Sequence, residues 1–250
     1  MFYKVFFTIC FACFGVICIG QGVVKDKPEQ TEVWEPVPEK VVPGVHTAAP
    51  SDAIILFDGT NLDAWEKESD DGMVGWLLKD GAMIVKPGSG GIKTKASFGD
   101  VQLHLEWLCP VNVGKEGQGY SNSGVFLMGK YEVQVLNSYE NKTYPNGQAG
   151  SIYKQHIPMV NASKPPGEWQ SYDIIFKAPV FGKLGNVREK ARVTVFHNGV
   201  LLHHNAILEG PTVYIGDPKY AVHADKLPIM LQDHGDKVRF RNIWLREIEL

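Results

Sequence analysis

Disulfide bonds contribute little to this protein, because cysteine is scarce in its sequence. The 250-residue chain has 4 cysteines, and Cys10, Cys13 and Cys18 fall near its N terminus. Cys109 stands alone in the rest of the sequence, so no internal disulfide is expected there. Stability must then come from a hydrophobic core, which the 44% hydrophobic composition is rich enough to build. Cys109 lies in the apolar row of a predicted strand, which favours a buried thiol over a nucleophile.

An excess of positive charge and helical periodicity are also absent. The formal net charge is −3 and no basic cluster occurs, so neither nucleic acid nor an anionic membrane surface is expected as a partner. After the first 50 residues, no long stretch carries the apolar stripe of an amphipathic helix. Short apolar or alternating runs are instead separated by Asp-Gly, Asn-Gly, Pro-Gly and Gly-Gly, which is typical of an all-β protein.

The N terminus has the pattern of a secretory signal peptide. Residues 1–20 contain one early lysine, an apolar run and small residues near the end. A lipoprotein anchored at Cys18 is the alternative, although Ile17 stands where a small residue is expected. Residues 21–50 are rich in Pro, Glu, Lys and Val and predict a linker, and 51–250 predict one folded domain. The protein is expected to be exported, to the periplasm or outside the cell, with no membrane contact beyond that lipid anchor.

The folded part predicts a sandwich of two antiparallel sheets. Asp80-Gly81 and Asn198-Gly199 each join two apolar runs, and both pairs suit the tight turns of β-hairpins. The expected strands are 53–57, 74–79, 82–86, 101–109, 122–128, 131–136, 169–177, 191–197, 200–207, 228–232 and 238–248.

The stretch from 119 to 139 predicts a hairpin with a polar face. Its two strands meet at Gly129-Lys130, and in the second one an apolar row alternates with Glu132 and Gln134. The strand 101–109 carries a similar polar row that includes His104 and Glu106. If both strands lie in one sheet, their polar rows line one surface, where a ligand would bind.

Two further stretches carry polar side chains. The loop 137–169 is too long to be a simple connection, which favours a functional role. Asp233 and His234 lie in a turn before the last strand, on which Arg239 and Arg241 share a face. Arginine pairs of this kind bind carboxylates or sugar hydroxyls through their planar forks.

Six blocks of sequence, in order, resemble the bacterial 3-keto-disaccharide hydrolase family, long described as a domain of unknown function. They are LFDGTNLDAW (56–65), NSGVFLMGKYEVQVLNS (122–138), YPNGQAGSIY (144–153), PPGEWQSYDIIFKAP (165–179), ARVTVFHNGVLL (191–202) and LQDHGDKVRFRNIWLREI (231–248). The resemblance implies a concanavalin A-like jelly roll that is exported from a bacterial cell and cleaves glycosides oxidised to a ketone at carbon 3. One departure is Asn137, where the family commonly has aspartate.

Such a substrate calls for a particular chemistry. A ketone at carbon 3 acidifies the proton on carbon 2, so a base can remove it and expel the aglycone from carbon 1. This route needs a base, a group that holds the enolate charge, and an acid for the leaving oxygen. It does not need the paired carboxylates of ordinary glycosidases. A laminarinase-like site would place Glu-x-Asp-x-x-Glu on one strand, whereas this strand offers Glu132-x-Gln134 without a second acid.

Glu132 is the expected base, with His234 or His156 as the other choices. A divalent metal is a candidate cofactor, held by Glu132, His156 and His234, although no tight H-x-H or C-x-x-C spacing occurs. The expected catalytic residues are Glu132 and His234, and the expected substrate contacts are Asn122, Gln134, His156, Asp233, Arg239, Arg241, Glu106 and Tyr153.

Simpler interpretations stand beside these. Glu132 is also compatible with a solvated strand residue, His234 with an ordinary turn residue, and the two arginines with cross-strand pairing to Glu106 or Glu132. The competing function is a non-catalytic carbohydrate-binding module, since the same fold and polar surface would serve a lectin. The enzyme would be distinguished from the lectin by a pocket that contains both a base and a group that holds the electrophile.

Overall fold

The structure is a computed structural model that describes residues 25–70, 72–111 and 114–249. The predicted signal peptide, 1–20, lies outside these residues. The chain divides after Lys40 into two units, and the first contains the short 3-10 helix η1 (Pro28–Gln30) among its described residues. The second unit begins at Val41, so the last ten residues of the predicted linker belong to the folded part. No helix in the described ranges is apolar and long enough to cross a membrane.

Thr47 explains why residues 41–50 join the folded unit. Its hydroxyl group donates to Glu106 Oε1 at 2.9 Å, and its carbonyl oxygen accepts from Trp244 Nε1 at 3.0 Å and from Asn242 Nδ2 at 2.9 Å. A composition rich in proline and charge predicted a linker here, but these long-range hydrogen bonds carry no local sequence signal.

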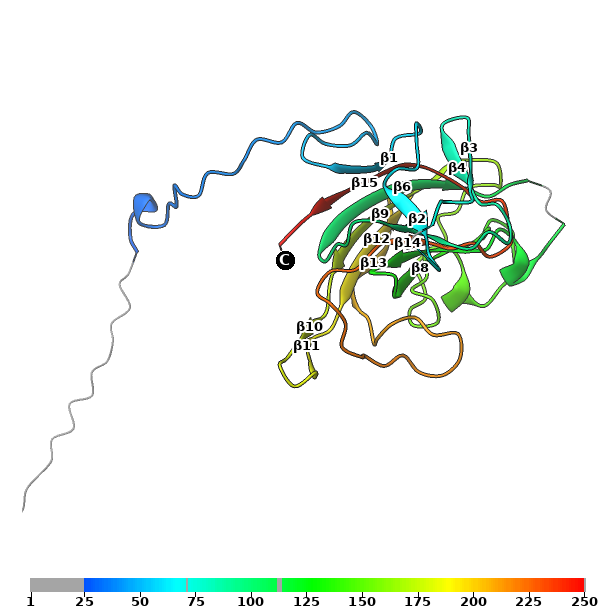
Figure 1. Cartoon of the computed structure of the whole chain (residues 1–250). Coiled ribbons are helices and arrows are strands. Elements are labelled where there is room, and N and C mark those ends of the chain that lie inside the picture. The colour runs from blue at the N-terminus through cyan, green and yellow to red at the C-terminus, as the bar shows by residue number, and fades with distance from the viewer. Residues whose placement is uncertain (1–24, 71, 112–113, 250) are drawn as a thin grey trace, which may run out of the picture. The chain divides into compact units, whose positions relative to one another are not determined.

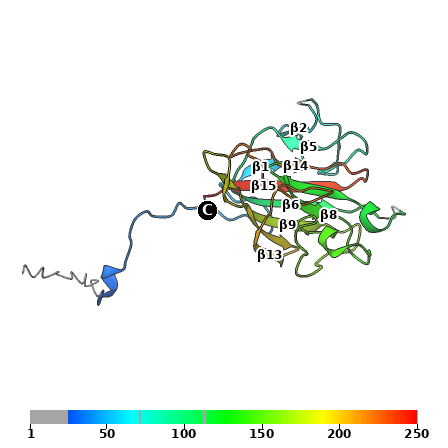
Figure 2. The same cartoon turned by 90° about the horizontal axis from the view of Figure 1, so that it is seen from below.

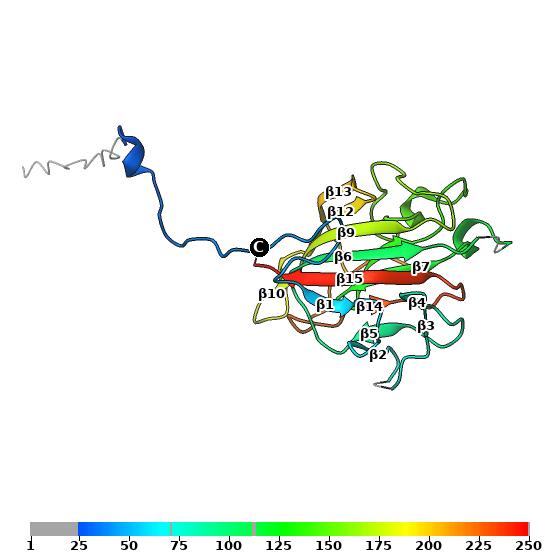
Figure 3. The same ribbon diagram turned by 90° about the horizontal axis from the view of Figure 1, so that it is seen from above.

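The larger sheet has eight strands in the described part of the chain. Seven follow the order β13-β12-β9-β6-β15-β4-β3, and β1 pairs with β15. Figure 3 shows β13, β12, β9, β6 and β15 side by side. The strands are β1 (Ile54–Phe57), β3 (Leu77–Lys79), β4 (Ala82–Ile84), β6 (Val101–Leu108), β9 (Gln170–Lys177), β12 (Arg192–His197), β13 (Val200–Ile207) and β15 (Arg239–Glu247).

The smaller sheet has five strands among the described residues, in the order β2-β5-β14-β7-β8. In Figure 2, β5 lies between β2 and β14. The strands are β2 (Trp65–Lys67), β5 (Ile92–Thr94), β7 (Ser123–Leu127), β8 (Tyr131–Val135) and β14 (Met230–Leu231). Outside both sheets lie the ribbon of β10 (Val180–Phe181) with β11 (Val187–Glu189) and the 3-10 helices η2 (Gly117–Gly119) and η3 (Pro145–Gly147).

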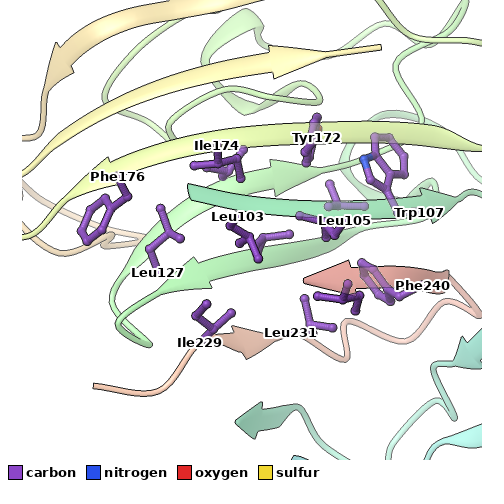
Figure 4. Close-up of a cluster of buried hydrophobic side chains, with 14 of the residues drawn as sticks. Leu103, Leu105, Trp107, Leu127, Tyr172, Ile174, Phe176, Ile229, Leu231 and Phe240 are labelled. Atoms are coloured by element: carbon purple, nitrogen blue, oxygen red, sulfur yellow. The ribbon is translucent and has the colours of Figure 1, made fainter. Parts of the chain in front are cut away.

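The core lies between the two sheets, as expected for a sandwich. Alternation puts Leu103, Leu105 and Trp107 of β6 inside, against Leu127 of β7 and Leu231 of β14. Figure 4 shows these side chains meeting between the sheets. Cys109 is buried in the same core, as predicted. All named pairings are antiparallel, so the prediction of an all-β, jelly-roll sandwich is confirmed (Figure 1).

Turn chemistry matches the sequence at two hairpins and differs at a third. Both residues of Asp80-Gly81 and of Asn198-Gly199 have positive φ, as the tight turns require. Between β7 and β8, however, the positive φ values fall on Met128 (54°) and Gly129 (61°). The turn is therefore centred one residue earlier than the predicted Gly129-Lys130.

The prediction that β6 and β8 share one sheet is wrong. β6 lies in the eight-stranded sheet and β8 in the five-stranded sheet. Their apolar rows both face the core, so the row of Glu106 and the row of Glu132 face opposite sides of the sandwich. Alternation predicts which residues share a face of a strand, but it carries no information about the neighbouring strand.

Candidate active site

A pocket of about 590 Å³ opens on the outer face of the five-stranded sheet. The β7-β8 hairpin forms its floor, and four irregular segments form its walls: 114–122, 137–169, 208–228 and 232–238. Its lining residues are Gln118, Asn122, Phe126, Glu132, Gln134, Tyr144, Tyr153, Thr212, Tyr214, Gln232 and His234.

Glu132 is the carboxylate on the floor of this pocket. Its side chain points away from the core because its neighbours Tyr131 and Val133 point inward. The residue is 5% exposed, and its carboxyl group has no hydrogen-bond or ion-pair partner in the described part of the chain. Burial without a compensating charge raises the pKa of Glu132 to about 8. A carboxyl group in this state exchanges a proton near neutral pH, as a general acid or base must.

A glycine leaves room for this carboxyl group. Gly124 lies beneath it on β7, and a Cβ atom there would come within 2.6 Å of both Glu132 Oε1 and Phe126 Cε2. Any larger residue would displace the Glu132 side chain or the Phe126 ring. On the other side, the backbone N–H of Glu132 donates to Thr212 Oγ1 at 3.0 Å, which ties the segment 208–228 to the edge of β8.

Three tyrosines form an aromatic wall. The hydroxyl groups of Tyr144 and Tyr153 are hydrogen-bonded at 2.8 Å. Burial, the hydrogen bond to Tyr144 and the nearby Glu132 charge all raise the pKa of Tyr153, so its phenol stays protonated. Lys154 holds the third ring: its Nζ lies 4.2 Å from the centroid of Tyr214 and donates to the Tyr214 carbonyl oxygen at 2.6 Å. The wall therefore offers flat rings and O–H donors.

Three amides meet on the floor of the pocket. Gln118 Nε2 donates to Thr143 Oγ1 and to the carbonyl oxygen of Gly147, both at 2.8 Å. Its Oε1 faces Asn122 Nδ2 and Gln134 Nε2, each at 3.4 Å. This cluster links the floor to two of the loops.

His234 lines the rim of the pocket and is exposed. It reaches this place because β14 pairs with β7, so the chain that leaves β14 runs past the floor. Two hydrogen bonds hold that exit: Gln232 N donates to the Gly124 carbonyl oxygen at 3.1 Å, and Ser123 Oγ donates to the Gln232 carbonyl oxygen at 2.6 Å.

The pocket thus brings together five of the predicted site residues. They are Asn122, Glu132, Gln134, Tyr153 and His234.

Two other predicted contacts lie near the pocket but do not line it. Asp233 accepts from the backbone N–H groups of Gly90 and Gly235, so its carboxylate shapes a turn. His156 Nε2 donates to the carbonyl oxygen of Ile207 at 2.7 Å, beside β13. This hydrogen bond holds the His156 ring beside the eight-stranded sheet, so His156 does not line the pocket.

Glu106, Arg239 and Arg241 lie on the other side of the sandwich. Arg241 Nε donates to Glu106 Oε2 at 2.6 Å, which is the cross-strand pairing considered as the simpler interpretation. Arg241 also lies over the Trp169 ring, with 4.0 Å from Cζ to the centroid. Arg239 forms an ion pair with Asp80 at 3.7 Å. Glu106, Arg239 and Arg241 were expected to face Glu132. That expectation is wrong, because β6 and β15 belong to the eight-stranded sheet.

A buried charge cluster accompanies Glu106. His104 Nδ1 donates to Asp173 Oδ1 at 2.7 Å, and its Nε2 lies 3.9 Å from Glu106 Oε1. Burial opposes the charge on His104, but the two carboxylates outweigh it and raise the pKa of His104 to about 9. Burial also opposes the charge on Glu106, and hydrogen bonds from His104, Asn242, Arg241 and Thr47 outweigh it and lower the pKa of Glu106. These groups satisfy one another, which indicates a structural role.

The predicted metal set does not fit this arrangement. In the ranges that the structure describes, no group of three or more His, Cys, Asp or Glu side chains is placed to hold an ion. Glu132 and His234 line the pocket, while His156 is hydrogen-bonded elsewhere.

Several pocket residues were not predicted. Gln118, Thr212 and Tyr214 come from irregular segments in which no periodicity marks a face, so the sequence offers no signal for them. Phe126 and Gln232 do carry a signal: Phe126 lies on the outward side of β7, and Gln232, directly after β14, continues the alternation of that strand. Asn137, the departure from the family pattern, is buried in a turn where its Oδ1 accepts from Tyr139 N, and it does not line the pocket.

An antiparallel sandwich with a buried carboxyl group, amides and aromatic rings in one outer pocket suits a carbohydrate-active enzyme, and comparison with known proteins agrees. The chain belongs to the family described as the 3-keto-alpha-glucoside-1,2-lyase-like domain, whose model matches residues 52–246.

Two solved structures from Parabacteroides distasonis ATCC 8503, each described as a putative glycosyl hydrolase, are similar to this chain. The first is 47% identical with a TM-score of 0.86, and the match covers 91% of this chain and 99% of that one. The second is 20% identical with a TM-score of 0.58, covers 79% of this chain and 94% of that one, and supports the fold alone. No curated protein matches this chain.

Proposed function

We propose that this chain cleaves the glycosidic bond of 3-keto-glycosides by elimination, with Glu132 as the base. The observation that carries the proposal is the Glu132 carboxyl group, buried and unpaired on the floor of the pocket, with a pKa raised to about 8. The family description, which names a 3-keto-alpha-glucoside-1,2-lyase, supports the substrate and the reaction type.

The reaction begins with proton transfer from carbon 2 of the sugar to Glu132. The ketone at carbon 3 acidifies this proton, because the electron pair of the broken C–H bond is delocalised as an enolate. That pair then forms the double bond between carbons 1 and 2, and the bond from carbon 1 to the aglycone oxygen breaks. The leaving oxygen takes a proton, for which His234 at the rim is the proposed donor. The products are an unsaturated keto sugar, to which water can later add, and the aglycone alcohol.

The enolate charge must be met by neutral donors or by His234, since neither lysine nor arginine lines the pocket among the residues that the structure describes. One phenol of the Tyr144–Tyr153 pair donates to the other, which leaves one O–H of the pair to donate to the enolate oxygen, and the raised pKa of Tyr153 keeps its proton in place. The same lack of positive charge favours a neutral sugar over a uronate.

Direct hydrolysis by a pair of carboxylates is disfavoured by the pocket. Retaining and inverting glycosidases use two carboxyl groups, about 5 or 6.5–9.5 Å apart. Glu132 is the one carboxylate among the described residues that line this pocket. A single carboxyl group of high pKa suits proton abstraction better than double displacement.

The experiment is incubation with a 3-keto-glucoside that carries a nitrophenol leaving group, in both anomeric forms, beside the unoxidised glucoside. We expect nitrophenol release from the keto sugar alone, with or without a chelator, and a strong loss of rate in Glu132→Gln. The matched control is Glu168→Gln, an exposed carboxylate outside the pocket, which should keep the wild-type rate. Release from neither sugar refutes the proposal, and release from both indicates an ordinary glycosidase.

A non-catalytic lectin is the second candidate, because the rings of Tyr144, Tyr153, Tyr214 and Phe126 in one pocket would also suit sugar stacking. Binding of a 3-keto-glucoside without any turnover would favour it.

We also propose that the chain is exported after removal of residues 1–20. N-terminal sequencing of the protein recovered from the periplasm or medium of the host tests this, and an intact N terminus on a cytoplasmic protein would refute it.

A further inference from the structure

The amides at the floor of the pocket have fixed orientations, and two backbone carbonyl groups determine them. The carbonyl oxygen of Gly147 accepts a hydrogen bond at 2.8 Å from the Gln118 side chain, so the NH₂ group of Gln118 must face it. Gln118 Oε1 is then turned toward Gln134, whose Nε2 lies 3.4 Å away. The NH₂ group of Gln134 therefore faces Gln118 and its Oε1 faces away.

The second carbonyl group belongs to Gln118 itself. Its backbone oxygen accepts from Asn122 Nδ2 at 2.8 Å, which fixes the NH₂ group of Asn122 in the same direction. Asn122 Oδ1 is left without a hydrogen-bond partner in the described part of the chain.

Both amides thus turn their oxygens away from Gln118. Gln134 is 1% exposed, and its Oε1 is buried without a partner among the described residues. An unpaired buried carbonyl oxygen is costly, and a ligand donor that reaches it recovers this cost. Gln118 and Asn122 have both N–H bonds of their NH₂ groups engaged, and one N–H of Gln134 faces Gln118. Among the described residues, this end of the floor therefore has two unpaired acceptor oxygens against a single unpaired N–H, that of Gln134.

We propose that Gln118 is a specificity-determining positioning residue, which orients Gln134 and Asn122 so that the floor selects a sugar through hydroxyl groups that donate. This inference rests on the proposed function and deepens it. A ketone or an enolate oxygen only accepts hydrogen bonds, so it is disfavoured on the amide floor. The keto group of the substrate then faces the phenol donors of Tyr144 and Tyr153, while other ring hydroxyls rest on the amides.

The test uses fluorine, which cannot donate a hydrogen bond. Titration calorimetry compares methyl glucosides in which the hydroxyl at carbon 2, 4 or 6 is replaced by hydrogen or by fluorine. At the position that contacts the floor, both replacements should weaken binding about five- to tenfold, with fluorine at least as harmful as hydrogen. If fluorine restores binding relative to hydrogen at every position, the floor donates and the proposal is wrong.

Variants of Gln118 test its role separately. Gln118→Met removes the acceptor for Gln134 Nε2, so the Gln134 amide is free to turn and the penalty for fluorine should fall at least threefold. Gln118→Glu keeps an acceptor at this place, so it should keep the penalty. A Gln118→Met protein that folds and discriminates fluorine like the wild type overturns the positioning role. If that variant does not fold, loss of discrimination in Gln118→Glu overturns the role instead.

The control is Gln155→Met. Gln155 also links two loops through the main chain, by bonds to Gly210 O and Glu209 N, but it does not line the pocket. Gln155→Met should keep the wild-type penalty for fluorine. If it loses this penalty as Gln118→Met does, then loosening of the loops alone explains the loss and the positioning role of Gln118 is refuted. Binding of these glucosides without release of nitrophenol from keto sugars would refute the proposed reaction and leave this inference standing. Absence of any glucoside binding, with nitrophenol still released from the keto sugar, would refute this inference and leave the proposed reaction standing.

Discussion

Replacing Glu132 by glutamine should stabilise the folded protein, and the gain should increase with pH. In the folded state burial raises the pKa of Glu132 from 4.5 to about 8, whereas the unfolded chain ionises near the lower value. Between these values the folded protein holds a proton that the unfolded chain has released. Stability is therefore lost as pH rises through this window.

The magnitude follows from the size of the shift. One pKa unit corresponds to about 1.4 kcal/mol, so the free energy of unfolding of the wild type should fall by about 4 kcal/mol, from this group, between pH 5 and pH 9. Glutamine has nearly the same shape and cannot ionise. The melting temperature of the variant minus that of the wild type should consequently increase by roughly 10 °C between pH 5 and pH 9.

Urea denaturation at pH 5, 7 and 9, followed by tryptophan fluorescence, measures the free energy of unfolding of both proteins. Subtracting the wild-type value from that of the variant cancels the contribution of groups that titrate alike in both. Glu168→Gln serves as the control and should change the free energy of unfolding by less than about 0.5 kcal/mol at each pH. If the gain in free energy of unfolding of Glu132→Gln over the wild type stays constant or shrinks as pH rises, the Glu132 carboxyl group is not buried and unpaired in the folded protein.

Three further results are expected. The kcat/KM for the keto-glucoside should rise with pH up to about 8, because the base acts as its ionised form, and a profile that falls over this range would contradict the assignment. Gly124→Ala should remove most activity and destabilise the protein by about 1–3 kcal/mol, because its Cβ would lie 2.6 Å from Glu132 Oε1; full activity would refute the contact. Glu106→Gln should lower stability by about 2–3 kcal/mol, measured by urea denaturation, yet leave the release rate unchanged because Glu106 lies on the other sheet.

Strands and their faces could be predicted from the sequence, because each depends on residues close together in the chain. The alternation around Glu132 correctly placed Tyr131 and Val133 in the core, and the apolar row of β6 was predicted in the same way. The short strands β2, β5, β10 and β11 were missed, since two or three residues carry too little periodicity.

The assembly of the pocket depends on contacts that alternation does not report. The local sequence pattern of β6 is the same whether β6 lies in the sheet of β8 or in the opposite sheet. For this reason Glu106 and Arg241 were expected beside Glu132. Tyr214 enters the pocket through a long irregular segment that is held by Lys154 and Thr212. Such contacts are set by tertiary packing, which one sequence does not reveal.

The most direct test of Glu132-dependent elimination follows the hydrogen at carbon 2. A 3-keto-glucoside labelled there with deuterium, mixed with enzyme and followed by NMR at early times, should lose the label in step with aglycone release and give an unsaturated sugar. Glu132→Gln should abolish both changes together. Release of a saturated 3-keto sugar that keeps its deuterium would contradict elimination, and undiminished loss of the label in Glu132→Gln would remove Glu132 from the role of base.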